Sequence, residues 1–171
     1  YATNRLNNNS ILGRQKSIEI RNVKNQNRNV ANKKCATKVI KSASINIDTI
    51  KIFCALLYWG EGSKNDSCLR FTNSDPKMIS TFLMLLRKGY KKINEKKLRC
   101  VLQIHEYHNE SKEIEFWSNI TKITPHQFTK SYRKTHTGSI TRQGYHGTIG
   151  IKYYDKNVVD QIIAIYNTLS D

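Results

Sequence analysis

Residues 56–62 read Leu-Leu-Tyr-Trp-Gly-Glu-Gly and close an apolar run. Apolar residues recur at helical spacing ahead of them, so a helix is predicted over about residues 48–60, with Asp48 as its N-cap. Glycine after a helix provides either a positive φ or room for a close neighbour. Glu61 would lie at the negative end of the helix dipole, which is unfavourable for an acid unless a cation neutralises it. The pattern therefore suggests a metal site at this helix end.

The chain after residue 48 alternates helix-like and strand-like segments, which predicts an α+β domain over residues 48–171. Asp75 and Pro76 form a typical helix start, an N-cap followed by proline in the first turn. A basic loop is expected over residues 130–142. The expected strands are 67–72, 97–105 and 147–154, and the expected later helices are 76–86, 111–123 and 158–166.

The charge of the chain is extreme and uneven. The 29 basic and 13 acidic residues among 171 give a net charge of +16. Residues 1–47 hold ten basic residues against Glu19 alone, which is +9 of that total. This predicts a basic helix or arm without a core of its own, which either stays solvated or contacts phosphate and orders on DNA. Its candidate contacts are Arg14, Arg21, Lys24 and Arg28.

Such a charge favours nucleic acid as the partner, with an anionic membrane surface second. No apolar run is long enough for a membrane-spanning helix. The first residue is Tyr1 rather than Met, which suggests that residues 1–47 are the tail of a missing upstream region. The four cysteines form no CxxC pair, so we expect buried free thiols and an intracellular location, in the cytoplasm, the nucleoid or an organelle. They are Cys35, Cys54, Cys68 and Cys100.

Residues 54–62, Cys-Ala-Leu-Leu-Tyr-Trp-Gly-Glu-Gly, resemble the nine-residue motif of the LAGLIDADG homing endonucleases and their non-cleaving relatives. Leu56 replaces a small residue of that motif, and Trp59 replaces its first acid. The motif occurs once in the chain. The residues that match the motif or stand for its small residue and metal-binding acid are Ala55, Leu57, Gly60, Glu61 and Gly62.

The resemblance implies a motif helix, a curved antiparallel sheet that lies on the major groove, and packing helices. It also implies a homodimer in which two motif helices pack side by side, and in which each Glu61, beside Gly60, binds Mg²⁺ at the scissile phosphates. Residues 152–159, Lys-Tyr-Tyr-Asp-Lys-Asn-Val-Val, add a second resemblance, to the segment where single-motif members carry an assisting lysine. Carried over, Lys152 would stabilise charge on the scissile phosphate.

Basic residues after position 48 are the expected nucleic-acid contacts, and arginines on strands could read guanine. The acidic group Glu106, Glu110, Glu113 and Glu115 is expected on a solvated face away from DNA, and Trp59 and Trp117 in the core. His105 and His108 are not expected to bind metal, because residues three apart on a strand face opposite sides. The expected contacts are Arg70, Arg99, Lys130, Arg133, Lys134, Arg142 and Lys152.

These observations predict a homodimeric, Mg²⁺-dependent endonuclease, a hydrolase that cuts double-stranded DNA at a pseudo-palindromic site. Two alternatives remain open. The first is a DNA-binding regulator that kept the fold without cleavage, which the departures at Leu56 and Trp59 favour. The second is an RNA-binding or intron-splicing protein, since the family includes maturases and a basic arm suits RNA.

Overall fold

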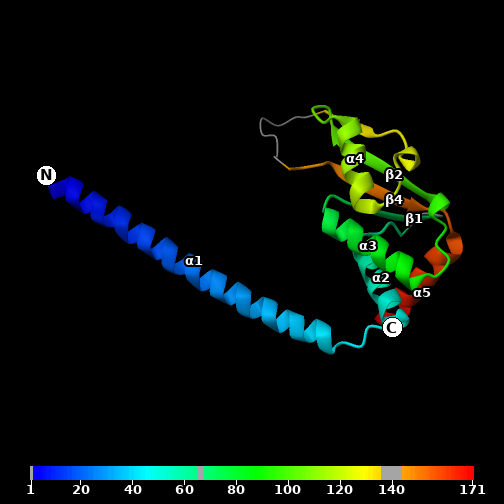
Figure 1. The fold of residues 1–171 in the computed structure, drawn as a ribbon, viewed down its shortest axis with the longest axis horizontal. Coiled ribbons are helices and arrows are strands. Elements are labelled where there is room, and N and C mark those ends of the chain that lie inside the picture. Colours follow the sequence, from blue (N-terminus) through cyan, green and yellow to red (C-terminus); the bar gives the residue numbers. More distant parts are fainter. Residues whose placement is uncertain (1, 65–67, 136–143) are drawn as a thin grey trace. The chain divides into compact units, whose positions relative to one another are not determined.

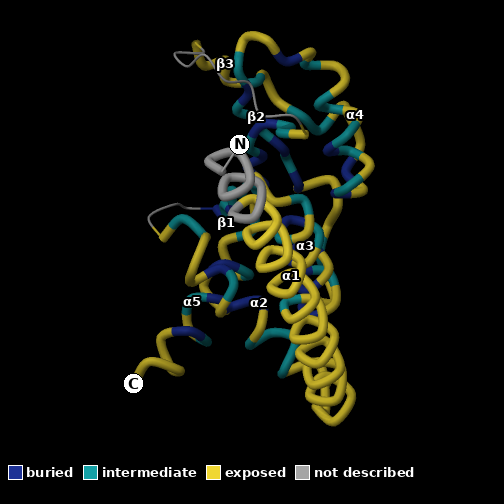
Figure 2. The backbone as a smooth tube through the Cα atoms, turned by 90° about the vertical axis from the view of Figure 1, so that its left-hand side faces the viewer, coloured by how far each residue is buried: buried dark blue, intermediate teal, exposed yellow. Residues whose placement is uncertain are grey.

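The computed structural model describes residues 2–64, 68–135 and 144–171, with side chains from residue 11 onward. The chain divides into two compact units, Tyr1–Ser44 and Ile45–Asp171. The first unit is a single helix, α1 (Ala2–Ser42), drawn in blue in Figure 1. Its described side chains are all exposed except that of Asn25, which is half-buried (Figure 2). From residue 11 onward, this unit therefore forms no core of its own.

Helix α2 (Ile47–Glu61) opens the second unit, and its start differs from the predicted one. Its N-cap is Asn46, whose side-chain oxygen accepts a hydrogen bond from the Thr49 amide at 2.8 Å. Asp48 lies in the first turn instead, 3.6 Å from the Lys51 ammonium. An acid is favourable there because the helix dipole is positive at this end. The prediction of Asp48 as the cap was therefore wrong by two residues.

Four strands form one sheet: β1 (Leu69–Asn73), β2 (Leu98–His105), β3 (Tyr132–Lys134) and β4 (Thr148–Tyr153). Their order is β1-β4-β2-β3, and β4 is antiparallel to both β1 and β2. Strand β3 pairs parallel with β2, so the sheet is mixed, and the expected all-antiparallel sheet is wrong. Helix α4 (Glu110–Thr121) lies in the crossover that brings the chain back to run beside β2. The expected loop at 130–142 thus contains a strand.

One face of the sheet packs against the helices. Alternate side chains along β2 are buried, from Leu98 to Ile104. The Phe71 ring of β1 stacks on Phe82 of α3 (Pro76–Gly89), with centroids 3.9 Å apart. Asp75 caps α3 ahead of Pro76, as predicted. Helix α5 (Lys156–Ser170) completes the α+β unit.

The two tryptophans occupy different environments. Trp117 is fully buried, as predicted. Trp59 is 41% exposed and stacks on Tyr166 of α5, with centroids 5.7 Å apart, so its predicted core position was wrong. Cys54, Cys68 and Cys100 are buried free thiols, as predicted, whereas Cys35 is free but exposed on α1, so its predicted burial was wrong. Among the described residues, no helix is long and apolar enough to cross a bilayer.

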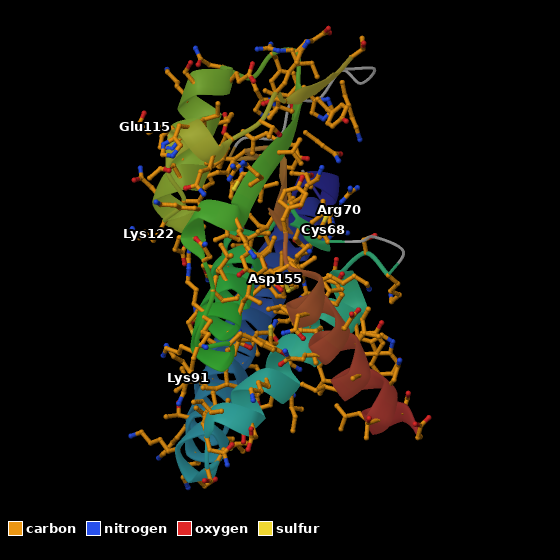
Figure 3. All side chains as sticks on the ribbon, turned by 90° about the vertical axis from the view of Figure 1, so that its right-hand side faces the viewer. Cys68, Arg70, Lys91, Glu115, Lys122 and Asp155 are labelled. Carbon is orange, nitrogen blue, oxygen red and sulfur yellow. The ribbon has the colours of Figure 1, made fainter. Side chains whose placement is uncertain are left out.

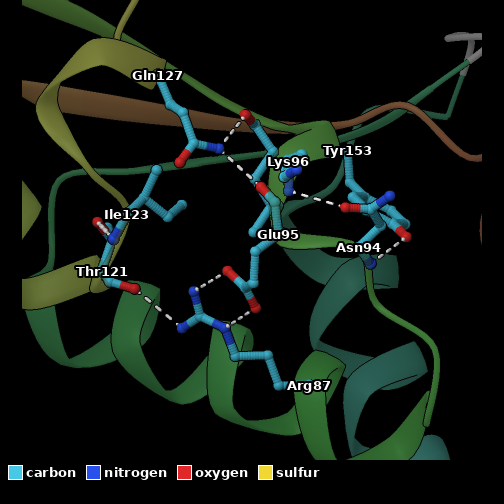
Figure 4. A network of polar contacts seen from close by, with 9 residues as sticks. Arg87, Asn94, Glu95, Lys96, Thr121, Ile123, Gln127 and Tyr153 are labelled. Atoms are coloured by element: carbon cyan, nitrogen blue, oxygen red, sulfur yellow. Dashed lines mark hydrogen bonds and ion pairs between the residues drawn. The ribbon is translucent and has the colours of Figure 1, made fainter.

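A polar network fixes the start of β2 (Figure 4). The Arg87 guanidinium of α3 holds both carboxylate oxygens of Glu95 at 2.8 Å and donates to the Thr121 carbonyl at the end of α4. The Gln127 amide donates to the carbonyls of Glu95 and Leu98. These bonds join α3, α4 and the turn before β2, so the register of β2 is set at the strand end that carries Arg99.

Candidate nucleic-acid interface

Three cations lie side by side across the sheet. The strand register places Lys152 of β4 directly opposite Arg70 of β1 and directly opposite Arg99 of β2. Directly opposed residues in antiparallel strands have Cβ atoms about 5 Å apart. We call Arg70, Lys152 and Arg99 the cation row. All three were predicted as nucleic-acid contacts, and the fold brings them together from three separate segments.

The cation row lies on the face of the sheet that the helices do not cover. Side chains alternate between the two faces of a strand, and along β2 the buried residues alternate with half-buried ones that include Arg99. We call this surface the open face. None of its described residues is acidic. They are Arg70, Thr72, Arg99, Val101, Gln103, His105, Thr148 and Lys152, joined through the β2–β3 register by Tyr132 and Lys134.

The members of the row differ in how they are held. The Arg99 guanidinium donates to the carbonyls of Lys96 and Leu98, at 2.8 and 2.7 Å, so it bends back along its own strand. The Lys152 ammonium makes no hydrogen bond or ion pair with any residue that the structure describes. Just beyond Lys152, the Lys97 ammonium lies 3.1 Å from Asp155 and lowers the pKa of that carboxyl. The strand end carrying Lys152 is therefore anchored, while its own charge is not neutralised by a described side chain.

Arg133 was predicted to belong to this group, but the register places it on the other side. It pairs with the buried Ile104, and its guanidinium lies 3.1 Å from the Glu110 carboxylate of α4. The neighbouring Ser131 and the hydrogen-bonded Arg133 guanidinium lower the pKa of Glu110. Lys130 is exposed just before β3. Arg142 lies outside the described residues, and Arg14, Arg21, Lys24 and Arg28 lie on α1 in the other unit.

The acidic group is only partly a solvated face. His146 Nδ1 lies 2.8 Å from a carboxylate oxygen of Glu113, and the Trp117 indole N–H donates to the His146 carbonyl. Helix α4 therefore holds the segment before β4. Glu110 is paired as described, which corrects the expectation for these two acids. Glu115 is exposed. Figure 3 shows it on the outer side of α4, across the unit from Arg70.

Glu61 is the last residue of α2 and is exposed. Its Oε2 accepts a hydrogen bond from the Asn73 amide at 3.2 Å, and the Asn73 oxygen accepts one from the Asp75 amide. Asn73 ends β1, three residues after Arg70. At a rise of about 3.3 Å per residue, these two positions on β1 are about 10 Å apart. One short strand therefore carries both the partner of Glu61 and one end of the cation row, although Asn73 and Arg70 project from opposite faces of it.

Tyr58 builds the turn that presents Glu61, which sequence reasoning missed. Its carbonyl accepts the Gly62 amide at 2.7 Å, and its hydroxyl donates to the Ser63 carbonyl. Gly62 has a φ of −83°, so it is not there for a left-handed backbone. A Cβ on Gly62 would overlap the Tyr58 ring and lie 2.5 Å from its carbonyl oxygen. Glycine is required at position 62 because Tyr58 lies so close to it. In the sequence, this contact could have been suspected from an aromatic residue four positions before a glycine.

The same turn joins α2 to the sheet. The Ser63 amide donates to the Arg70 carbonyl at 2.9 Å, and Gly62 forms a bridge with Phe71. The backbone that leaves Glu61 therefore pairs directly with the strand that carries Arg70. The orientation of the acid relative to the cation row is fixed by main-chain bonds as well as by Asn73.

The residues at this helix end suit a loosely held Mg²⁺ better than a closed metal cage. No three His, Cys, Asp or Glu side chains gather as a metal-binding group within the described part of the chain. Mg²⁺ is usually held by one or two carboxylates, with water and substrate phosphates completing its shell. One exposed Glu61 carboxylate and the Gly60 carbonyl, which lies beyond the last helical bond from Gly62 to Tyr58, fit that pattern.

The histidines near β2 serve packing in this structure. His105 ends β2 and His108 lies in the following turn, so they do not share a strand as the prediction assumed. Their rings stack with centroids 5.9 Å apart, and His108 Nε2 lies 2.8 Å from the Tyr145 carbonyl oxygen. A structural role therefore accounts for the buried His108.

An apolar groove runs between α2 and α3. Phe53 and Leu56 of α2 and Met84 of α3 are each more than 40% exposed, although they are large and apolar. The groove is thus an uncovered stripe on the motif helix, on the side of α2 that faces α3. It is lined by Ile45, Ile50, Phe53, Leu56, Leu57, Thr81, Met84, Leu85 and Lys88.

The Ile45–Asp171 unit therefore combines a basic open face, a carboxylate anchored to the same sheet, and an uncovered apolar stripe on the helix that ends in that carboxylate. Comparison of the chain with family models, with curated proteins and with solved structures finds no match to any of them.

Proposed function

We propose that the Ile45–Asp171 unit binds double-stranded DNA with its open face and cuts it as a LAGLIDADG-like, Mg²⁺-dependent endonuclease. The cation row carries this proposal. Like charges directly opposite each other in a sheet are destabilising. The register creates two such pairs, Arg70 with Lys152 and Lys152 with Arg99. A phosphate backbone along the row would neutralise this repulsion and release counterions, which favours binding.

A duplex is the polyanion that this surface fits best. The major groove of B-DNA is about 12 Å wide and admits a two-stranded ribbon. Alternate side chains of β1, β4 and β2 project from the same face, and Gln103 and the arginines have the hydrogen-bonding groups that pair with adenine and guanine edges. Phosphate contacts would position the protein, and such base contacts would select the site.

The proposed catalytic residues are Glu61 and Lys152. Asn73 and Tyr58 hold Glu61 at the end of β1 and act as positioning residues. Lys152 would direct its positive charge at the phosphate, where charge develops during cleavage. Mg²⁺, held by Glu61 and substrate phosphates, would supply an activated water and stabilise the leaving oxygen.

A homodimer is part of this proposal, because each chain has one motif and one Glu61. Exposed apolar patches mark association surfaces, and the α2 stripe with Phe53 and Leu56 is such a patch. A second copy on this stripe would bring two Glu61 residues toward one site. Leu56→Glu would place two like charges at the seam, which is costly when they are buried.

Sedimentation of the full chain tests the dimer. Wild type is expected to sediment as a dimer and Leu56→Glu as a monomer, whereas Ser111→Glu, an exposed change on α4, should remain dimeric. A wild-type monomer that binds its site fully would contradict the two-fold arrangement.

The function itself is tested with a randomised duplex library incubated with the full chain in Mg²⁺ or Ca²⁺. Selected sequences with new ends in Mg²⁺, and intact selected sequences in Ca²⁺, are the expected result. Enrichment without new ends in Mg²⁺ or Mn²⁺ would leave a DNA-binding regulator. Retention of RNA with no duplex enrichment would instead identify an RNA-binding protein.

A further inference from the structure

Helix α1 has few features that would stabilise it as an isolated helix. It spans 41 residues, yet its described side chains are exposed on every side, with Asn25 alone half-buried. Nine of its residues are asparagine, and seven more are valine or isoleucine. These residue types are weak helix formers, and most helices in proteins owe their stability to a packed apolar face. The described side chains of this unit form no packed apolar face, and its many asparagine and β-branched residues weaken its helix propensity.

Charge repulsion adds to this weakness. Arg21, Lys24 and Arg28 follow one another at spacings of three and four, and so do Lys34, Lys38 and Lys41. Residues three or four apart are neighbours on a helix surface, and like charges there destabilise it. Each triplet is therefore a strip of mutually repelling cations, and an anion alongside would reverse the sign of that interaction.

The two strips lie on different sides of the helix. At 3.6 residues per turn, the second strip is rotated by about 110° from the first. Arg14 extends the first strip, since Arg14, Arg21 and Arg28 are seven residues apart and drift by only about 20° per step. These three span about 21 Å at 1.5 Å per residue. The helix thus offers cations in two directions.

We propose that residues 14–41 bind in the major groove of duplex DNA as a helix, and that the duplex stabilises this helix. An α-helix is about 10–12 Å across, so it fits a groove about 12 Å wide. Phosphates line both walls of that groove, which suits strips about 110° apart. Duplex RNA fits less well, because its major groove is too deep and narrow for side chains. The inference rests on the proposed function only in taking double-stranded DNA as the ligand.

A helix-breaking variant separates this mode from simple attraction of a polycation. Asn25→Pro keeps every charge but removes a helical hydrogen bond within the first strip and clashes with the preceding turn. Asn25→Ala is the matched control, because it keeps the charges and favours the helix while also losing the Asn25–Arg28 contact. Binding of the full chain to a 20-base-pair duplex of arbitrary sequence is measured for both across a salt series.

The expected result is at least a tenfold higher Kd for Asn25→Pro than for Asn25→Ala, with a shallower dependence of log K on log salt. Circular dichroism at 222 nm should show a gain of helix when duplex is added to wild type or Asn25→Ala, and a smaller gain for Asn25→Pro. Equal affinities and salt slopes for the two variants would overturn the proposal, because charge alone would then explain binding. An equal loss on duplex RNA would overturn the major-groove assignment.

Failure of this inference can be told apart from failure of the proposed function. Removing two of the three charges of the cation row with Arg70→Gln and Lys152→Gln leaves α1 unchanged. If those substitutions do not alter binding or cutting while Asn25→Pro still weakens binding, the sheet proposal fails and the helix inference stands. The reverse pattern refutes the helix inference alone.

Discussion

The two units of this chain carry positive charge in opposite ways. Tyr1–Ser44 holds +9 on one helix whose described side chains are exposed and form no core, and its cations are close together because they are close in sequence. Ile45–Asp171 holds the remaining +7 around a buried core. There, Arg70, Arg99 and Lys152 come from three distant segments and meet only through strand register. The first unit concentrates positive charge by composition, whereas the second presents it at positions that strand register defines.

The largest expected effect is a loss of DNA cleavage without a loss of DNA binding. Glu61→Gln keeps the side-chain shape and removes the charge that Mg²⁺ needs. Cutting of the best selected duplex should fall at least a hundredfold, since each 1.36 kcal/mol of lost transition-state stabilisation is tenfold in rate. Binding in Ca²⁺ should survive, because the charges of both units remain.

Glu115→Gln is the control for this substitution, as Glu115 is an exposed acid on the outer side of α4. Its cutting rate should match wild type. Equal cutting by wild type and Glu61→Gln would refute the assignment of Glu61, whatever the protein binds.

Substitutions at two glycines, Gly62 and Gly60, test how much the turn after α2 contributes to the stability of the second unit. Gly62→Ala should destabilise the Ile45–Asp171 unit by about 2 kcal/mol, because its Cβ would overlap Tyr58. Gly60→Ala should instead be neutral or stabilising by up to about 1 kcal/mol, since no atom lies within 4 Å of the added Cβ and alanine favours the helix. Urea denaturation followed by tryptophan fluorescence measures both. Equal midpoints would show that the turn adapts without cost.

The cation row is expected to favour duplex binding while lowering the stability of the folded unit. Arg70→Gln with Lys152→Gln should weaken duplex binding several-fold at moderate salt and reduce the slope of log K against log salt by about two, for two lost phosphate contacts. The unit itself should become slightly more stable, by a few tenths of a kcal/mol, because repulsion across the strands is relieved. Lys112→Gln, an exposed change on α4, is the single-charge control and should change neither the binding nor the stability. Lower stability together with unchanged binding would show that the row serves folding.

The smallest expected effect is a difference in thiol reactivity between the two units. Burial raises the pKa of Cys54 and of Cys100 from 9.0 to about 12, whereas Cys35 is exposed on α1. At pH 8 a thiol reagent should label Cys35 quickly and the three buried cysteines only on unfolding. Between pH 9 and 12 an unfolded chain releases thiol protons that the folded chain keeps, so stability should fall as the pH rises through this window. Rapid labelling of two or more thiols in the native protein would show that the core opens readily.

Local patterns predicted much of this structure because they act over a few residues. The Asp75–Pro76 helix start, the strand over 98–105 and the helical character of the basic segment depend on capping, alternation and spacing. Errors arose where neighbours in space decide. Strand β3 is three residues long with exposed side chains, and only its pairing with β2 makes it a strand. Trp59 is apolar enough for a core, but it lies on a side of α2 where it stacks on Tyr166 of α5 and stays 41% exposed.

The sequence by itself determined the excess of positive charge, the concentration of that charge in residues 1–47, and an acid placed between glycines at the end of an apolar helix. Charge and helical periodicity are properties of nearby residues, so they can be read along the chain. Only the tertiary structure decided that Arg70, Lys152 and Arg99 form one row, that Arg133 faces Glu110, and that Asn73 holds Glu61. These relations depend on strand order and register, which arise when distant segments bury their apolar faces together.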